Sequence, residues 1–376
     1  MDTISKLKIL TAGAKVDVSC PSVCSLKLLM TNVCIYDCAY CAHRRSNDIP
    51  RAVFAPEEIA ALTMLYYRRK LVSGLFLSSG IIKSPDYTME LMIKALRILR
   101  VEHRFRGYIH AKVMPGADRE LLTQLGRLAD RMSINIELPT EESLIHIAPD
   151  KNRKAILSPM GYVSSAISQS GEKNFAPAGQ CTQLIVGATP ENDRTIVNLA
   201  QGLYGKYGLR RVFYSAYEPV NGRDRDKKLP VDDPPLLRQH RLYQADFLLR
   251  SYGFCADELF NPSRENLSLN LDPKCRWALE NMQIFPVEVN RADLFEILRV
   301  PGIGQISAKR IVSARRLGSL DFDSLKKMGV SLARAKYFIT CNGKMHNRAA
   351  LLNGHVEFLE RKLSDNEWEQ QMLIPH

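Results

Sequence analysis

From residue 26 onward, apolar residues follow two alternating patterns: short runs typical of strands and longer amphipathic stretches typical of helices. The short runs predict strands over residues 26–32, 75–78, 108–113, 132–138, 182–188 and 211–216. The amphipathic stretches predict a helix that begins at Pro56 and further helices over 4–14, 87–100, 118–128, 141–148, 151–168, 192–204 and 236–252. Strands that alternate with helices of this length indicate parallel βα units, and six strands suit a partial (βα)6 TIM-like barrel.

Two of the predicted strands carry polar side chains on one face, because successive side chains of a strand point to opposite sides. The two polar sets are Tyr108, His110 and Lys112, and Ser133, Asn135 and Glu137. A polar inner face suits strands that line a ligand cavity, whereas the alternative is a face exposed to solvent. Because function collects at the carboxyl ends of barrel strands, we take Lys112 and His110 as candidate catalytic residues facing the substrate.

A different pattern begins at Pro286. Two short predicted helices, over 290–299 and 305–316, are joined by the sequence Pro301-Gly302-Ile303-Gly304, and a degenerate copy follows over 325–335. Between Pro286 and Lys344 the chain has 11 Lys and Arg against 5 Asp and Glu, a net charge of +6 and half of the formal +12 of the whole chain. This local excess favours a polyanionic partner.

The length of 376 residues, 45% of them hydrophobic, suits a large first domain and a small second one. We predict an α/β domain over 1–255, a linker over 256–285, a small all-α domain over 286–345 and a helical tail over 346–376. The sequence has no apolar run long enough to span a membrane, and its N-terminus lacks the apolar core of a secretory signal. We therefore expect a cytoplasmic protein with no membrane partner.

Three of the nine cysteines, Cys34, Cys38 and Cys41, fall within eight residues directly after the first predicted strand. Thiolates are soft ligands that select iron–sulfur clusters, zinc or copper(I). A [4Fe–4S] cube takes four ligands, so this loop would leave one iron open. A zinc ribbon would show a second CxxC pair further on, and none follows. The alternatives are a zinc site or inert buried thiols, and Cys20 with Cys24 could contribute to a second metal site.

The spacing CxxxCxxC, with the aromatic Tyr40 before its last cysteine, resembles the signature of the radical S-adenosylmethionine superfamily. The resemblance implies a partial (βα)6 barrel in which Cys34, Cys38 and Cys41 hold three irons of a [4Fe–4S] cluster. It also implies that S-adenosylmethionine chelates the fourth iron and is cleaved reductively to a 5′-deoxyadenosyl radical that abstracts hydrogen. An electron donor such as flavodoxin or ferredoxin would be a partner.

The same resemblance assigns Tyr40 and further residues to cofactor binding. Ser78-Ser79-Gly80 stands where the superfamily has its GGE motif, with serines in place of the glycine pair and no Glu after it. Glu137 is in the position of the residue that contacts the ribose. The stretch that ends in Val186-Gly187 is similar to the superfamily's adenine-binding stretch, without its first glycine.

The PGIG sequence and its degenerate copy resemble a tandem helix-hairpin-helix module, which binds DNA through the sugar–phosphate backbone. The implied contacts come from the hairpin loop and the basic residues near it: Gly302, Ile303, Gly304, Ser307, Lys309, Arg310, Lys326 and Lys327. Nearly the whole chain, to about residue 345, resembles the radical S-adenosylmethionine family associated with DNA modification or repair.

Three hypotheses remain open on the sequence alone. The first is a radical enzyme that acts on DNA, and the second is the same chemistry applied to RNA. The third is a DNA-binding protein without enzymatic activity, whose cluster is structural or senses redox state. The hairpins could also serve only for packing.

Overall fold

The computed structural model describes residues 1–10, 24–170, 175–219, 228–230, 232–346 and 356–364, and the chain divides into two compact units. Unit 1 comprises residues 1–191 and 202–235, and unit 2 comprises 192–201 and 236–376. Within the ranges that the structure describes, no helix is long and apolar enough to cross a membrane.

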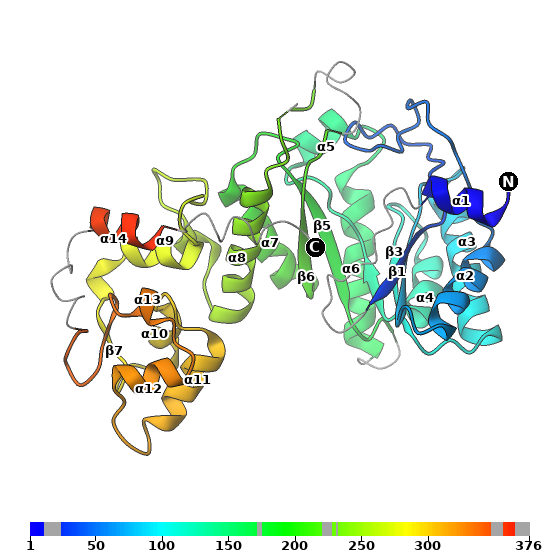
Figure 1. Ribbon diagram of the computed structural model, residues 1–376. Coiled ribbons are helices and arrows are strands. Elements are labelled where there is room, and N and C mark those ends of the chain that lie inside the picture. The colour runs from blue at the N-terminus through cyan, green and yellow to red at the C-terminus, as the bar shows by residue number, and fades with distance from the viewer. Residues whose placement is uncertain (11–23, 171–174, 220–227, 231, 347–355, 365–376) are drawn as a thin grey trace. The chain divides into compact units, whose positions relative to one another are not determined.

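Unit 1 is built on a six-stranded parallel sheet in which the strands follow one another in chain order, a half-barrel (Figure 1). The strands are β1 Ser25–Leu29, β2 Gly74–Ser78, β3 Tyr108–Lys112, β4 Arg131–Ser133, β5 Gln180–Val186 and β6 Arg211–Ala216. This confirms the predicted partial barrel.

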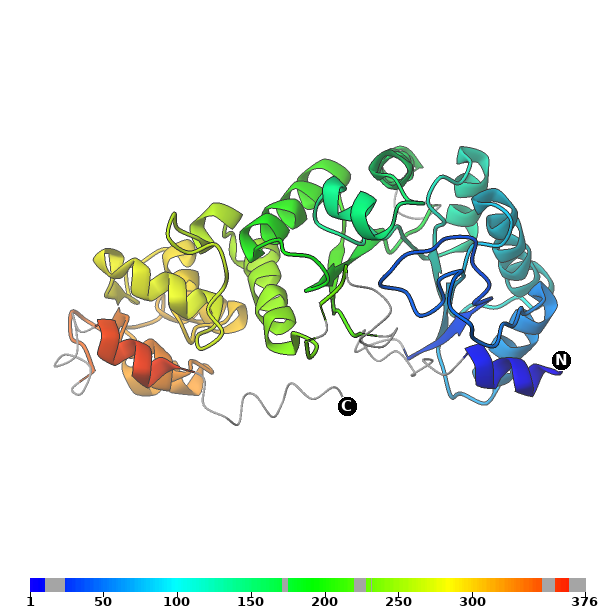
Figure 2. The ribbon, with the colours of Figure 1, turned by 90° about the horizontal axis from the view of Figure 1, so that it is seen from above.

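The helices of unit 1 connect consecutive strands and cover the outside of the curved sheet, as Figure 2 shows for α2, α3, α4 and α6. Their bounds are α2 Pro56–Arg68, α3 Pro85–Arg97 with the π-helix Ile98–Glu102, α4 Arg119–Leu128, α5 Glu141–Ile147 and α6 Arg153–Ser170. α1 Thr3–Leu10 precedes β1, and α7 Asp193–Tyr207, between β5 and β6, has its first residues in unit 2 and its last in unit 1. Local sequence fixes several starts. Pro56 occupies the first turn of α2, and the carboxylate of Asp118 caps α4 by accepting the N–H of Glu120 at 2.8 Å.

Strand β4 is shorter than predicted, because its pairing with β5 ends at Ser133. Beyond it, backbone bonds to β5 continue at Ile134 and Glu137, and between them the Thr182 hydroxyl accepts the N–H of Ile136 at 2.8 Å and donates to the carbonyl of Ile134 at 2.7 Å. Glu137 then adopts a left-handed backbone conformation with φ of 63°. The polar residues of this segment are buried, which excludes a solvent-exposed face here.

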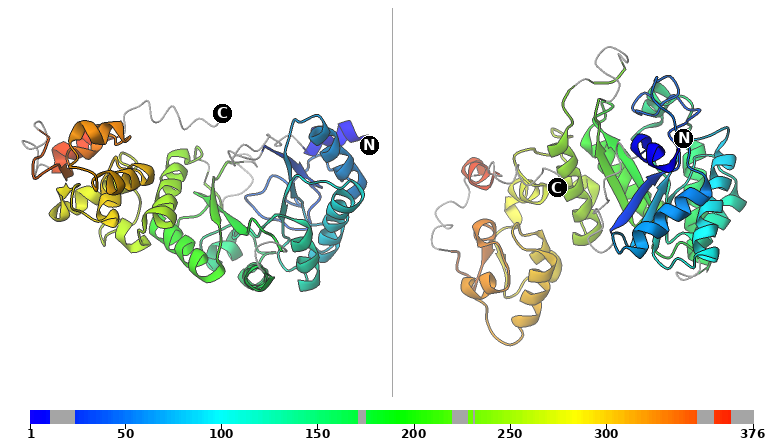
Figure 3. Two further views of the ribbon diagram at one scale, coloured as in Figure 1. Left: turned by 90° about the horizontal axis from the view of Figure 1, so that it is seen from below. Right: turned by 45° about the vertical axis from the view of Figure 1, so that its right-hand side comes forward.

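Unit 2 contains α8 Leu236–Tyr252, α9 Pro273–Glu280, α10 Leu294–Arg299, α11 Gln305–Ala314, α12 Phe322–Lys327, α13 Leu332–Ala335 and α14 Val356–Leu363. The predicted linker over 256–285 is wrong. The segment folds into α9 and the 3-10 turns Ala256–Leu259 and Met282–Ile284, and Leu271, Cys275 and Ala278 are fully buried. The right-hand view of Figure 3 shows these segments in yellow among the other helices of the unit.

The expectation of an all-α second domain also needs correction. β7 Val287–Glu288 and β8 Ile339–Thr340 form a two-stranded parallel sheet that ties the two ends of the hairpin region together. Its β-branched residues favour that pairing.

The predicted tail helix is present in part, as α14. Its Leu359 and Leu363 are buried, and Glu360 forms an ion pair with Arg276 of α9 at 2.7 Å, so the segment belongs to the fold of unit 2. Cys20 and residues 11–14 of the predicted N-terminal helix lie outside the described residues, as do 347–355 and 365–376.

Candidate functional site

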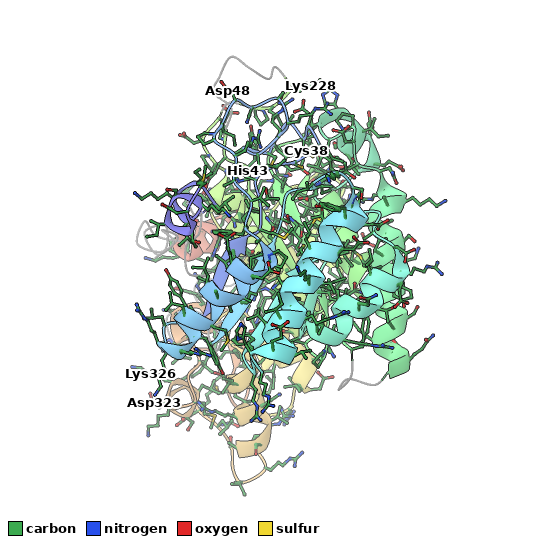
Figure 4. All side chains as sticks on the ribbon, turned by 90° about the vertical axis from the view of Figure 1, so that its right-hand side faces the viewer. Cys38, His43, Asp48, Lys228, Asp323 and Lys326 are labelled. Atoms are coloured by element: carbon green, nitrogen blue, oxygen red, sulfur yellow. The ribbon has the colours of Figure 1, made fainter. Side chains whose placement is uncertain are left out.

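The three motif cysteines lie on the loop between β1 and α2, at the carboxyl end of the strands, where Figure 4 labels Cys38 and His43. The segment after β2 holds this loop in place. Gly80 donates its N–H to the carbonyl of Thr31 at 2.7 Å, and Ile35 donates to the carbonyl of Ile81 at 2.9 Å. A side chain at Gly80 would overlap the carbonyl oxygen of Val33, so only glycine permits this approach.

The sulfurs of this loop are free thiols, with Cys38 buried and Cys34 and Cys41 half-buried. Backbone N–H groups already point at two of them: Ile81 N–H to Cys34 Sγ at 3.5 Å, and His43 N–H to Cys41 Sγ at 3.4 Å. Burial raises the pKa of the Cys38 thiol to about 11 and also raises the pKa of Cys41. A cationic metal centre would displace these protons, because only thiolates act as ligands.

In the described part of the chain, no three His, Cys, Asp or Glu side chains converge to hold a single metal ion. The cysteines of a cube do not share one ion, since each binds a different iron. Three free thiols on one loop, two of which receive N–H donors, therefore fit the donor set of a cluster.

Next to the cysteines lies a buried group that sequence reasoning missed. The ammonium of Lys151 donates to the hydroxyl of Tyr40 at 3.0 Å and to the carboxylate of Glu137 at 2.9 Å. The Lys151 and Glu137 side chains are only 10% and 8% exposed. Lys151 is the first residue of the predicted helix 151–168 and precedes the observed α6 by two residues, a place where a lysine is ordinarily solvated. Only the fold brings it to the motif.

Both partners of this pair are charged. Burial by itself would raise the pKa of Glu137, but the ammonium of Lys151, with that of Lys112, outweighs it and holds the pKa below its ordinary value. Burial would likewise lower the pKa of Lys151, yet Glu137 and the Tyr40 hydroxyl raise it well above the ordinary value. The pair thus joins the cysteine loop to the segment that follows β4.

The other residues assigned to the cosubstrate lie at the same end of the sheet. Ser78 ends β2, and the hydroxyl of Ser79 donates to the carbonyl of Gly80 at 2.6 Å. Val186 ends β5, and Gly187 follows it with φ of 86°. The N–H of Ile185 donates to the Glu137 carbonyl at 2.7 Å, which brings the ends of β4 and β5 together.

The candidate catalytic residues His110 and Lys112 lie on β3, both half-buried. The ring of His110 meets Phe76 edge-to-face with 4.6 Å between centroids, and its Nε2 lies 3.6 Å from the sulfur of Cys181. Lys112 lies close enough to Glu137 to help lower the pKa of that carboxyl. Lys112 is therefore the nearer of the two to the end that carries the cysteines.

In unit 2, two helix pairs follow each other, α10 with α11 and α12 with α13, and the loop of each contains a glycine in the left-handed region, Gly302 and Gly329. A Cβ on Gly302 would lie 2.6 Å from the carbonyl oxygen of Ser331, whose N–H donates to the Gly302 carbonyl at 2.9 Å. Gly302 is thus required for packing the pairs together.

Apart from the loop glycines Gly302 and Gly304, which are half-buried, the predicted DNA-contact residues divide into two groups. Ile303 is buried, and the buried hydroxyl of Ser307 donates to the carbonyl of Met328 at 3.2 Å, so these two hold the pairs together. The exposed group consists of basic residues of α11 and α12: Lys309, Arg310, Lys326 and Lys327. Figure 4 labels Lys326 on α12. Arg310 also donates to the Met328 carbonyl at 3.2 Å.

Lys274 of α9 supports the PGIG loop from within unit 2. Its buried ammonium donates to the carbonyl of Ile303 at 2.6 Å and lies 4.6 Å from the centre of the Tyr252 ring. Burial lowers its pKa to about 7, with Arg299 adding to this effect and Asp272 opposing it.

This shift predicts how the stability of the protein depends on pH. The unfolded chain holds the Lys274 proton to about pH 10.4, so between pH 7 and that value it binds more protons than the folded protein. The free energy of unfolding therefore gains about 2 kcal/mol from this residue as the pH rises from 7 to about 9. Urea unfolding of the wild type and Lys274→Met at both pH values should show that gain in the wild type only. An equal dependence in both proteins would contradict it.

No protein-family model matches this chain, and no curated protein matches it. Among solved structures, HydG, a maturase of the [FeFe]-hydrogenase, is similar at 13% identity over 59% of this chain and 49% of HydG, with a TM-score of 0.45. HydG from Carboxydothermus hydrogenoformans is similar at 17% identity over 59% of this chain and 50% of that protein, with a TM-score of 0.44.

A third similar structure is the radical S-adenosylmethionine methyltransferase TsrM from Kitasatospora setae, which holds cobalamin and a [4Fe–4S] cluster. The identity is 12% over 77% of this chain and 60% of TsrM, with a TM-score of 0.40. The chain spans about half the length of the two HydG structures. At these TM-scores the similarities do not assign the chain to a family.

Proposed function

We propose that this protein is a radical S-adenosylmethionine enzyme that acts on DNA. One observation carries the enzymatic part: three free thiols lie on one loop at the carboxyl end of a six-stranded parallel half-barrel, beside a buried Lys–Glu pair. A cluster held by Cys34, Cys38 and Cys41 would supply reductive cleavage of S-adenosylmethionine and a carbon radical able to abstract hydrogen. An external electron donor such as flavodoxin or ferredoxin belongs to this proposal.

The chain's own residues bind and orient. Lys151 keeps the Glu137 carboxylate ionised, and a buried carboxylate can accept hydrogen bonds from the ribose hydroxyls of the cosubstrate. In this proposal the backbone of Ser78-Ser79-Gly80 binds its amine, and Val186-Gly187 packs against its adenine. Lys112 and His110 face the side from which a substrate would approach.

Anaerobic reconstitution of the full chain tests the enzymatic part. The expected result is about four irons and four sulfides per chain, and release of 5′-deoxyadenosine from S-adenosylmethionine after reduction. If the protein binds iron but does not cleave S-adenosylmethionine, the result would instead favour a redox-sensing DNA-binding protein. Stoichiometric zinc in place of iron would overturn the proposal.

DNA as the substrate is supported by the exposed basic residues next to two glycine-containing helix–loop–helix turns. Contacts between lysine side chains and phosphates release counterions, so affinity should fall steeply with salt and vary little with sequence. Mass spectrometry of nucleosides, after incubation of reduced protein with DNA or with RNA, separates a DNA-modifying enzyme from an RNA-modifying one.

We predict that Lys309→Gln lowers duplex DNA affinity several-fold at low salt and reduces the salt dependence by about one phosphate contact. Gly304→Ala should also weaken binding, because its Cβ would obstruct the approach of a phosphate to the N–H groups at the start of α11. The fold can accept this Cβ, since its nearest atom, the Tyr252 hydroxyl oxygen, is 3.8 Å away. Fluorescence anisotropy at several salt concentrations measures both. Lys94→Gln, on the exposed surface of α3, is the matched control for loss of one charge. If DNA binding does not depend on the salt concentration, the helix pairs serve only for packing.

A further inference from the structure

Unit 2 contains a cavity of about 370 Å³, lined by residues of α8, α9, α13 and the PGIG loop. Phe247 and Tyr252 of α8 form part of its wall, and their rings meet edge-to-face with 5.5 Å between centroids. Phe247 is 47% exposed, so the cavity opens to solvent. Gly302 also lines it, which places the cavity beside the loop that we propose to bind phosphate. The volume is in the range of sites for small organic groups.

The wall of this cavity includes the buried side chain of Lys274. Its nitrogen lies 4.6 Å from the centre of the Tyr252 ring and donates to the carbonyl of Ile303, the neighbour of Gly302, at 2.6 Å. Tyr252 and Gly302 line the cavity as well, so the nitrogen lies at the cavity wall. Among the residues that the structure describes, the Ile303 carbonyl is the one hydrogen-bond acceptor of Lys274.

The surroundings of Lys274 favour a neutral amine over an ammonium ion. The nearby carboxylate of Asp272 has other partners: one oxygen accepts the N–H of Cys275 at 2.9 Å, and the other forms an ion pair with Arg334 at 2.6 Å. Arg299 adds positive charge, and burial penalises the ammonium further, so the pKa of Lys274 falls to about 7. At neutral pH about half of the protein molecules therefore carry an amine with a free lone pair there, which is the nucleophilic form of lysine.

We propose that Lys274 captures the aldehyde of an abasic site in DNA as an imine. A deoxyribose that has lost its base presents C1′ as an aldehyde in its open-chain form. The lone pair of the amine attacks this carbon, and the carbonyl oxygen leaves as water with the two hydrogens of the amine. A C=N bond replaces the C=O bond without oxidation or reduction, so the step needs no further reactant.

The inference rests on the proposed function for DNA as the partner of the PGIG loop. A phosphate bound at that loop would bring the adjoining sugar to the mouth of the cavity, because Gly302 belongs to both. The aromatic wall formed by Phe247 and Tyr252 would keep water away from the imine.

The experiment traps the imine with sodium borohydride after incubation of the full-length protein with duplex DNA that carries one abasic site. We expect one covalent adduct per chain, which peptide mass spectrometry maps to Lys274. A duplex with tetrahydrofuran at the same position has no aldehyde and should give none. Lys274→Met should lower the yield at least tenfold, whereas Lys94→Met, on the exposed surface of α3, should retain it. Thermal unfolding checks that each variant is folded.

The pH dependence of trapping gives a second readout in the wild type. The initial rate should rise with pH and reach half of its plateau near pH 7, because the neutral amine is the reactive form. An exposed lysine, with a pKa of about 10.4, would instead give a rate that still rises above pH 9.

Absence of an adduct, an adduct on other lysines, or an unchanged yield in a folded Lys274→Met variant would overturn the inference. So would equally fast trapping of 2-deoxyribose 5-phosphate at the same concentration, because that sugar carries the aldehyde without DNA. If Lys274→Met does not fold, the mapped adduct of the wild type decides. The reaction needs neither iron nor S-adenosylmethionine. A protein that forms the adduct but does not cleave S-adenosylmethionine would refute the enzymatic part of the proposed function alone. A protein that cleaves S-adenosylmethionine and binds intact duplex but forms no adduct would refute this inference alone.

Discussion

Replacing any one of Cys34, Cys38 and Cys41 with alanine should remove most of the iron from the anaerobically reconstituted protein and abolish formation of 5′-deoxyadenosine. Loss of a residue that merely supports a ligand already lowers metal affinity about 10–100-fold, so loss of a ligand should exceed that. The fold should survive, since each change removes a single sulfur, half-buried at Cys34 and Cys41 and buried at Cys38, and alanine leaves the backbone bonds of the loop intact. Iron analysis and the charge-transfer absorption of the cluster measure the loss.

Cys24→Ala is the matched control. Cys24 is also a half-buried free thiol in unit 1, but its sulfur lies 3.6 Å from the carbonyl oxygen of Leu71, away from the motif loop. This variant should retain wild-type iron. If it loses as much iron as the three motif variants, the iron is not held by the motif, and the proposed centre is wrong.

The half-barrel was predictable because most of its strands and helices are marked by patterns within their own stretch of sequence. Short apolar runs bounded by turn residues gave β1, β2, β3, β5 and β6, and caps such as Asp118 marked where helices begin. The early end of β4 was not predictable, since it depends on the Thr182 hydroxyl of another strand bonding to Ile134 and Ile136. Nothing in the sequence of β4 and the segment after it indicates that interaction.

The linker prediction failed for a related reason. Prolines and isolated polar residues over 256–285 indicate turns, but they do not reveal that Cys275 and Leu271 become fully buried when α9 packs in unit 2. At the site, the cysteine spacing located the motif, because ligand spacing is encoded along the chain. Lys151 was missed, because burial of a lysine 14 residues after its carboxylate partner is decided by tertiary structure alone.

Lys151→Met should lower the free energy of unfolding of the metal-free protein by about 3–5 kcal/mol, because it leaves the Glu137 carboxylate buried without its partner. Glu137→Gln should lower the free energy of unfolding by a similar amount, because it leaves the ammonium of Lys151 buried without its carboxylate partner. Urea unfolding measures both. The expected cause is the buried, unpaired charge and not lost packing, since methionine has nearly the side-chain volume of lysine, and glutamine nearly that of glutamate.

The double variant Lys151→Met/Glu137→Gln decides between these causes. If the cost comes from a stranded charge, removing both charges should be less destabilising than the sum of the single changes by at least about 2 kcal/mol. The exposed pair Lys94–Glu57, at 2.7 Å and with side chains 59% and 58% exposed, gives the control. Lys94→Met should cost less than about 1 kcal/mol, because solvent screens that pair. Additive costs at Lys151 and Glu137 would mean that the two charges do not depend on each other, and that Tyr40 and the cysteine loop are not held through them.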